Sequence, residues 1–301
     1  MFFVISGFCM GASTQGKFSG GFQKTTYLRY VLNRFLRIAP AYYVSMIFWY
    51  LIITKYNVVV KPVAEFDLLT HIFFVHNFFN DTMYSVSGVY WTLAAEMQFY
   101  LLLPILFSLL SSLSKQIMTL GATFVLALSI AILSNDVVLI FGLPAYLCLF
   151  IAGVLSYFHR ENIYKALSKC GLIWFVVAFM VTLIFSPYGV YQNRARVFEI
   201  IISCLFVIAL AYASVRERYS NRKNNVYVVM AFIGRCSFSI YLYNYVMLAL
   251  PVEYSGVVNF LILFTVTLAI GIFAHFIIEK PFEKLRKALM RTRTVAASGS
   301  I

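Results

Sequence analysis

Long runs of apolar residues dominate the sequence and decide what this chain can fold into. A transmembrane helix needs about 20 such residues to cross ~30 Å of hydrocarbon. A spanning segment must also satisfy its own backbone hydrogen bonds, and the alternating short strands of a barrel are absent. The sequence therefore predicts an all-α polytopic transmembrane helix bundle of about eight full spans. These lie at about 41–56, 88–110, 117–134, 137–157, 171–187, 196–214, 227–250 and 257–278.

Composition supports a membrane protein over the other classes. The 301 residues are 62% hydrophobic and 12% charged, whereas about 25% of the residues in a soluble domain are charged. A soluble globular domain, a disordered chain and a disulfide scaffold are thereby excluded. The five cysteines are an odd number without a CxxC pair, so we interpret them as buried apolar residues and predict no metal site.

The distribution of positive charge predicts the orientation in the membrane. The net charge is +13, but the cations gather in short clusters between apolar runs, which argues against nucleic acid as a partner. If residues 13–40 are cytoplasmic and the spans alternate, 19 of the 24 cations fall on the cytoplasmic side. This bias predicts a multi-pass protein of the inner (plasma) membrane, with membrane lipids as partners and a cytoplasmic C-terminus.

Three segments do not fit a full span. Residues 1–12 are apolar but would reach only ~18 Å as a helix, so we expect them to be the end of a span whose beginning is missing. Residues 68–79 are apolar and short, which favours an interfacial or re-entrant helix. Residues 288–301 are predicted to form a disordered cytoplasmic tail.

The first candidate functional residues are Arg34 and Arg37, which lie three positions apart and would share a helix face. Pro40 suits the first turn of the following helix, which puts both arginines at the cytoplasmic edge. They could anchor the protein to anionic headgroups. Alternatively, they could bind the phosphates of a nucleotide-like substrate, since a guanidinium binds phosphate through two hydrogen bonds.

The second candidate is Glu96, which lies about eight residues inside the predicted span 88–110. An ionisable residue inside a membrane is costly and therefore points to function. Burial makes a carboxylate more basic, which suits a proton acceptor or a group that orients one. The alternative is a structural partner for a neighbouring Arg or Tyr.

The third candidate set lies in residues 234–245, where Arg235, Ser237, Tyr241 and Asn244 interrupt an apolar run. Tyrosines near a span end are typical of an interface belt, and Ser and Asn of interhelical hydrogen bonds. That explanation is weaker for Arg235 and Asn244.

The four histidines show no metal-ligand spacing, because the only close pair, His71 and His76, is five residues apart. Each histidine is interpreted as structural. The residues alone leave two classes open. One is a membrane enzyme that uses Arg34, Arg37 and Glu96, and the other is a transporter that uses Glu96 and Arg235 as coupling charges.

Four stretches in this order resemble the acyltransferase 3 family of integral-membrane O-acyltransferases, over residues 2 to about 287. The most specific of them is WTLxxExxFYLxxP. The stretches are FFVISGF (2–8), RFLRIAPAYY (34–43), GVYWTLAAEMQFYLLLP (88–104), and GRCSFSIYLYNY (234–245) followed by IEKPF (278–282).

The resemblance implies a membrane O-acyltransferase that moves an acyl group, usually acetyl, from cytoplasmic acyl-CoA to a hydroxyl of a lipid-linked or exported glycan. Acyl-CoA is then the donor substrate and no cofactor is tightly bound. Arg34 and Arg37 match the family's donor-binding RxxR, and Glu96 matches the acid of its WTLxxE stretch. Trp91, Phe99 and Tyr100 would pack the pocket.

The chain departs from the family pattern in two places. The family's first helix, with its Arg and His, would precede residue 1, so residues 1–287 resemble an N-terminally truncated domain. Asn244 stands where the SxxYLxH stretch usually ends in His, and Asn cannot titrate. His71 and His76 lie in another segment and are not assigned the role of the family's His. The alternatives are an inactive fragment or accessory protein, or a transporter.

Overall fold

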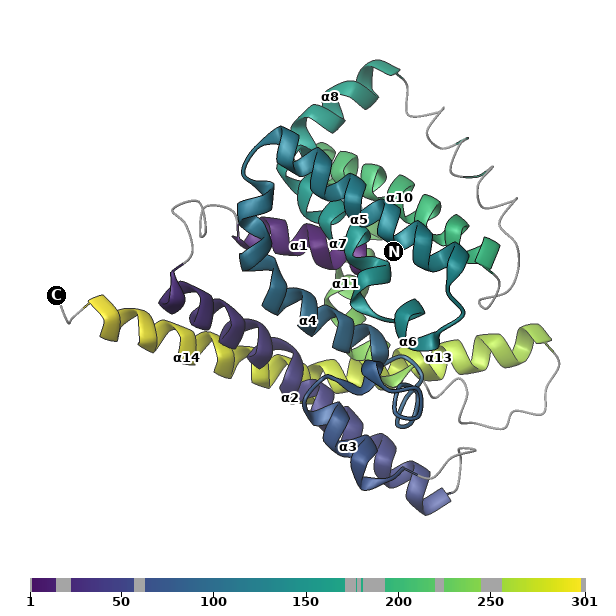
Figure 1. Cartoon of the computed structure of the whole chain (residues 1–301). Helices are drawn as coiled ribbons and strands as arrows, with labels where there is room; N and C mark the ends of the chain where they lie inside the picture. Colours follow the sequence, from purple (N-terminus) through teal and green to yellow (C-terminus); the bar gives the residue numbers. More distant parts are fainter. Residues whose placement is uncertain are drawn as a thin grey trace. The chain divides into compact units, whose positions relative to one another are not determined.

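The computed structural model describes residues 2–14, 23–56, 63–170, 177, 180, 193–219, 225–244 and 256–298 (Figure 1). These residues form helices, turns and loops without a strand, which confirms the predicted all-α class. The chain divides into two compact units. Unit 1 comprises Met1–Thr26 and Gln98–Arg222, and unit 2 comprises Tyr27–Met97 and Lys223–Ile301.

Six helices in the described part of the chain are long and apolar enough to cross a membrane. They are Lys24–Lys55, Trp91–Leu110, Leu113–Leu133, Val137–Phe158, Val197–Arg216 and Val258–Met290. Of the other two predicted spans, 171–187 lies outside the described residues except for positions 177 and 180. The other, 227–250, is described only to residue 244, and its apolar helix, Val228–Tyr243, is shorter. The polytopic bundle is therefore confirmed, whereas the count of eight is not.

Unit 1 is built around the crossing of two helices, and its interior is aromatic. Helix α1 packs against α7, and the ring of Phe99 stacks on that of Phe150 with centroids 4.1 Å apart. Small residues allow the helices to approach, because a Cβ at Gly7 would lie 2.1 Å from the Phe150 carbonyl oxygen. The helices of this unit are α1 (Phe2–Thr14), the second half of α4 (Trp91–Leu106), η2 (Phe107–Leu110), α5 (Leu113–Leu133), α6 (Val137–Ile140), α7 (Leu143–Phe158), α8 (Arg160–Cys170) and α10 (Asn193–Tyr219).

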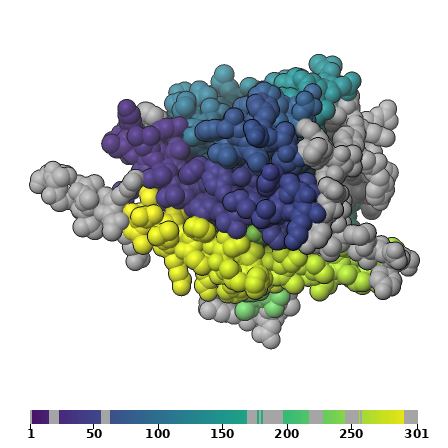
Figure 2. Space-filling view, turned by 90° about the horizontal axis from the view of Figure 1, so that it is seen from below, coloured from purple at the N-terminus to yellow at the C-terminus, as the bar shows by residue number. Residues whose placement is uncertain are grey.

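Unit 2 pairs two long helices. The first part of helix α2 lies beside α14, the last part of the continuous helix formed by α13, η3 and α14 (Figures 1 and 2). Arg29 donates a hydrogen bond to the Met290 carbonyl oxygen at 3.1 Å, and Arg286 donates one to Asn33, so α2 and α14 are joined at two points. The helices of this unit are α2 (Lys24–Tyr56), α3 (Glu65–Ile72), η1 (His76–Phe78), the start of α4, α11 (Asn225–Tyr243), α13 (Gly256–Ala274), η3 (His275–Glu279) and α14 (Lys280–Ser298).

The structure corrects two local expectations. Helix α2 runs unbroken through Pro40, so both candidate arginines lie inside one 33-residue helix and not before a second helix that starts at the proline. At ~1.5 Å per residue this helix is ~50 Å long, so its cationic first part can extend beyond the hydrocarbon layer. Helix α14 continues to Ser298, where a disordered tail was predicted from residue 288.

The outer surfaces of several helices are apolar, as a membrane protein requires. Only 17% of the spanning stretch is buried in α5, and the same holds for Val258–Met290. Large apolar side chains such as Met118, Leu133 and Phe260 are exposed there. A soluble protein rarely leaves such continuous apolar surface open to water, so these faces are suited to lipid.

Candidate active site

A groove of about 750 Å³ in unit 2 collects charged residues from helices far apart in the sequence. It lies along α2, α11, η3 and α14. Its charged and hydroxyl-bearing lining residues are Arg37, Arg235, Ser237, His275, Glu279, Lys280, Glu283 and Lys287. The structure thus brings Arg37, from the first candidate pair, together with Arg235 and Ser237, from the third candidate set.

Positive charge is in excess in this groove. Four of its lining residues are Lys or Arg and two are Glu. Glu283 is already engaged, because it pairs with Arg286 at 2.6 Å and with Lys287 at 3.3 Å. Among the described residues, Arg37 and Arg235 have no carboxylate within 4 Å, so their guanidinium groups are available for an anionic ligand.

A turn of π-helix forms one wall of the groove. The Lys280 N–H bonds to the His275 carbonyl oxygen, five residues back, and the π turn covers His275–Glu279. His275 Nδ1 lies 2.9 Å from Glu279 Oε2, and the Ser239 hydroxyl donates to the same oxygen at 2.6 Å. Single π turns inside α-helices are rare and frequently occur at functional sites.

The two arginines of the RxxR pair have different surroundings. Arg34 is buried, with 6% of its surface exposed, and its guanidinium lies 5.8 Å from the Tyr30 ring centroid. Arg37 is exposed and lines the groove. Arg34 and Arg37 therefore do not bind one ligand side by side in this structure. Arg37 is the arginine that is suited to contact a ligand.

Glu96 is buried in unit 2, with 6% of its surface exposed. It interacts electrostatically with Tyr30 of α2 and Tyr241 of α11, and Tyr30 also interacts with Arg34. The carboxyl group thus belongs to a buried polar cluster of Tyr30, Arg34, Glu96 and Tyr241, as expected for a costly intramembrane acid.

Tyr241 connects α11 to the start of α4. Its hydroxyl donates to the Val89 carbonyl oxygen at 2.6 Å and also bonds to the Thr92 hydroxyl. Trp91, beside Thr92, is half-buried. Asn244 follows α11 in a turn, and its Oδ1 has no hydrogen-bond partner among the described residues.

Phe99 and Tyr100 belong to unit 1. Phe99 is fully buried against Phe150, and the Tyr100 hydroxyl bonds to Ser6 Oγ at 3.3 Å. Both side chains therefore contribute to the core that holds α4 against α1 and α7.

A second polar cluster in unit 2 contains two histidines. The rings of His71 and His76 stack with centroids 3.9 Å apart and planes 5° from parallel, and both side chains are fully buried. His71 Nδ1 lies 2.7 Å from the Asp67 carbonyl oxygen. Burial lowers the pKa of His71 to about 4 and that of His76 well below its usual range, so both are neutral at pH 7. A metal lies in the plane of each imidazole it binds, and parallel stacked planes do not meet at one ion.

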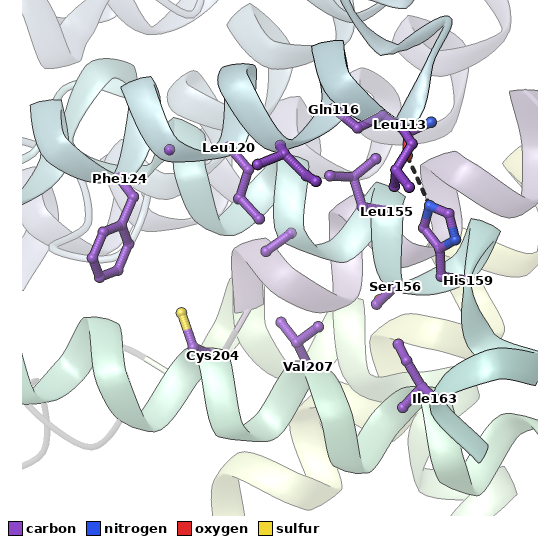
Figure 3. Close-up of a pocket in the computed structure, with 13 residues that line it drawn as sticks. Leu113, Gln116, Leu120, Phe124, Leu155, Ser156, His159, Ile163, Cys204 and Val207 are labelled. Carbon is purple, nitrogen blue, oxygen red and sulfur yellow. Dashed lines mark hydrogen bonds between the residues drawn. The ribbon is translucent and has the colours of Figure 1, made fainter. Parts of the chain in front are cut away.

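Unit 1 contains a different cavity, of about 610 Å³, between α5, α7, α8 and α10 (Figure 3). Its lining is almost entirely apolar. The exception is one end, where His159 Nε2 bonds to Gln116 Oε1 at 2.7 Å. This cavity suits a hydrocarbon chain and lacks the charge that a phosphate-bearing ligand needs.

The sequence analysis missed His275, Glu279 and the lysines of α14. The i,i+4 spacing of His275 and Glu279 was a usable signal, since such residues are neighbours on a helix. Lys280 and Lys287 carried no signal beyond the general clustering of cations, because their approach to α11 depends on the tertiary fold. No group of three or more metal-ligating residues occurs in the described part of the chain.

Comparison with known proteins identifies the fold family. Residues 1–279 match the family model for the acyltransferase 3 domain, described as "Acyltransferase domain". The chain belongs to this family. It is also 25% identical to "Putative acetyltransferase ORF330" of Acidianus two-tailed virus, over 88% of this chain and 75% of the viral protein. No solved structure matches.

Family membership confirms the predicted resemblance and shows that the protein is an acyl-transferring membrane enzyme. The matched region ends at Glu279, so it includes the π turn of this acyltransferase domain. The cationic groove and the buried Glu96 cluster of unit 2 are therefore candidate parts of an acyl-transfer site.

Proposed function

We propose that this protein transfers an acyl group, most simply acetyl, from acyl-CoA to a hydroxyl of an envelope or exported glycan. Acyl-CoA carries several phosphates on a flexible arm, so its site needs positive charge and several hundred Å³ of space. The groove of unit 2, with Arg37 and Arg235 unpaired among the described residues and a volume of about 750 Å³, meets both needs. This groove is the observation that carries the proposal.

In this proposal Arg37 binds donor phosphate from α2 and Arg235 binds it from α11. A guanidinium can donate two parallel hydrogen bonds to phosphate, which fixes orientation as well as charge. Lys280 and Lys287 add positive potential from α14. Arg34 acts from the interior, where it supports the buried cluster around Glu96, and Glu96 orients the acceptor hydroxyl or the base.

The proposed topology places this groove at the cytoplasmic edge of the membrane, on the side where acyl-CoA is made. The cation clusters in the first part of α2 and along α14 would both be cytoplasmic in an inner-membrane protein that follows the positive-inside rule. A reporter fused after residue 301 tests this: a cytoplasmic reporter should be active and a periplasmic one silent. The opposite result would contradict the orientation.

Binding of acetyl-CoA to the full-length protein in lipid nanodiscs tests the donor site. Removal of a charge-assisted contact costs about 1.5–3 kcal/mol, so Arg37→Ala should weaken binding about 10- to 100-fold. Arg37→Lys should recover only part of this loss, because a lysine ammonium cannot donate two parallel hydrogen bonds to phosphate as a planar guanidinium does. Lys115→Ala, an exposed cation outside the groove, is the control and should leave the Kd unchanged.

Turnover distinguishes the alternatives. An acyltransferase should release CoA from acetyl-CoA and acylate a hydroxyl compound such as methyl glucoside. A transporter should consume no acetyl-CoA and should tolerate Arg37→Ala. An inactive relative should release no CoA even where it binds acetyl-CoA, and either result would refute the proposal.

A further inference from the structure

We infer that His275 is the proton acceptor of the acyl-transfer reaction, held in position by Glu279 and Ser239. The inference rests on the proposed function and adds to it the group that takes the hydroxyl proton. It depends on a juxtaposition: a carboxylate-bound histidine lines the same groove as the two arginines that are unpaired within the described structure.

The hydrogen bonds of His275 fix its tautomer. Glu279 as a carboxylate can only accept, so Nδ1 must carry the proton in the 2.9 Å contact between Nδ1 and Oε2. Nε2 then bears the lone pair, and it makes no hydrogen bond to any described residue. His275 is partly exposed, with 16% of its side-chain surface accessible, so Nε2 can meet a ligand in the groove.

Ser239 holds the carboxylate in turn. Its hydroxyl, on α11, donates to Glu279 Oε2 at 2.6 Å, so two donors from two helices fix one oxygen atom. A base oriented by a carboxylate that is itself held is the arrangement used by hydroxyl-activating enzymes. Glu279 also stabilises the imidazolium that forms when Nε2 takes a proton.

The π turn indicates that this arrangement is more than a surface ion pair. In a regular α-helix, residues four apart are already neighbours, so a His–Glu contact needs no unusual backbone. Here the backbone departs from the α-helix over these five residues and returns to it at Lys280. The departure changes the direction in which the side chains of this turn project, next to Arg235 and Ser237 in the groove.

Acyl transfer at this site proceeds through a tetrahedral intermediate. The acceptor oxygen attacks the thioester carbonyl carbon and a C–O bond forms while the hydroxyl proton passes to His275 Nε2. The tetrahedral intermediate then collapses, the C–S bond breaks, and the CoA sulfur leaves. His275 returns its proton to that sulfur, so the products are the O-acyl ester and CoA thiol.

The test compares His275→Gln with His159→Gln in the full-length protein. Both replace a partly buried histidine that has one side-chain hydrogen bond, but His159 lines the apolar cavity of unit 1. With acetyl-CoA and methyl glucoside, His275→Gln should lower kcat at least 100-fold and change the Kd for acetyl-CoA less than threefold. His159→Gln should keep kcat within threefold of wild type.

The positioning residues need a readout of their own. Glu279→Gln and Ser239→Ala should each lower kcat while the Kd for acetyl-CoA stays within threefold of wild type. The reason is that the imidazole loses its orienting carboxylate in the first variant, and that carboxylate loses its hydrogen bond from Ser239 in the second. The other charged groups facing the groove are Arg37, Arg235, Lys280, Glu283 and Lys287, and all remain in these variants. Free imidazole should restore part of the rate of His275→Ala, a rescue that a purely structural role would not give.

The outcomes separate the two proposals. If wild type turns over acetyl-CoA and His275→Gln does so within threefold, the inference is wrong and the proposed function stands. If wild type neither binds nor consumes acetyl-CoA, the proposed function is wrong and the inference falls with it. A His275→Gln protein that still binds acetyl-CoA is folded, so a lost rate then reflects lost chemistry.

Discussion

A single methyl group added where α1 crosses α7 should destabilise the protein. A Cβ at position 7 would lie 2.1 Å from the Phe150 carbonyl oxygen, and one at Gly153 would lie 2.3 Å from the Val4 carbonyl oxygen. Ordinary van der Waals contact begins near 3.4 Å, so α1 and α7 would have to move apart by more than 1 Å to accommodate either substitution. The opposing atoms are backbone, so no side chain can rotate away. Overpacking lowers the free energy of unfolding by about 1–3 kcal/mol. Because the backbone cannot move aside easily, Gly7→Ala and Gly153→Ala should each cost ~3 kcal/mol.

Thermal unfolding of detergent-purified protein, followed by intrinsic fluorescence, measures this effect. At about 2–4 °C per kcal/mol, Gly7→Ala and Gly153→Ala should each lower Tm by ~6–12 °C. Gly121→Ala is the control, because α5 leaves nothing within 4 Å of its Cβ. Ala is the better helix former by about 1 kcal/mol, so the control should unfold no earlier than wild type. If Gly7→Ala and Gly121→Ala unfold within 2 °C of each other, the close crossing of α1 and α7 is wrong.

Two further predictions concern unit 2. The pKa of His71 is about 4 in the fold and 6.5 in the unfolded chain, so the unfolded state binds the proton first as pH falls. Stability is therefore lost between pH 6.5 and 4, by about 2 kcal/mol at pH 5. The Tm of His71→Asn should depend less on pH than that of wild type, and equal slopes would contradict the burial. Arg34→Ala should cost at least ~2 kcal/mol because its side chain is buried, whereas Arg37→Ala should cost under ~0.5 kcal/mol. A larger Tm loss for Arg37→Ala would reverse the assignment of these two arginines.

Hydrophobicity alone located most of the membrane helices, but it could not place their ends. Helix α2 begins at Lys24, well before the apolar run that starts near residue 41. Its first half is cationic, so it carries no apolar signal, and Pro40 indicated a break. The helix nevertheless continues, because proline inside a helix costs a few kcal/mol that tertiary contacts can offset. Among those contacts are the hydrogen bond that Arg29 donates to α14 and the one that Asn33 accepts from Arg286 of α14.

Side-chain direction limited the prediction of the site in the same way. Three residues of α-helix turn through ~300°, so Arg34 and Arg37 point ~60° apart around the axis. That difference is enough for one guanidinium to be buried beside Tyr30 while the other lines the groove. Sequence spacing predicts a shared face, whereas the divided roles depend on where α11 and α14 pack.

The role of position 244 illustrates why a motif and a site can differ. Asn244 occupies the position at which the family stretch usually ends in a histidine, and an amide cannot accept the proton of a hydroxyl. His275, taken alone, has no metal-ligand partner, so the sequence assigns it a structural role. The structure gives it a partner, because His275 Nδ1 and the Ser239 hydroxyl both bond to Glu279 Oε2 at the wall of the cationic groove. The most apolar stretch of Val258–Met290 has a mean hydropathy of 2.5, so a polar cluster placed against this helix carries an insertion cost that points to function. This cost is the physical reason to test His275 before Asn244.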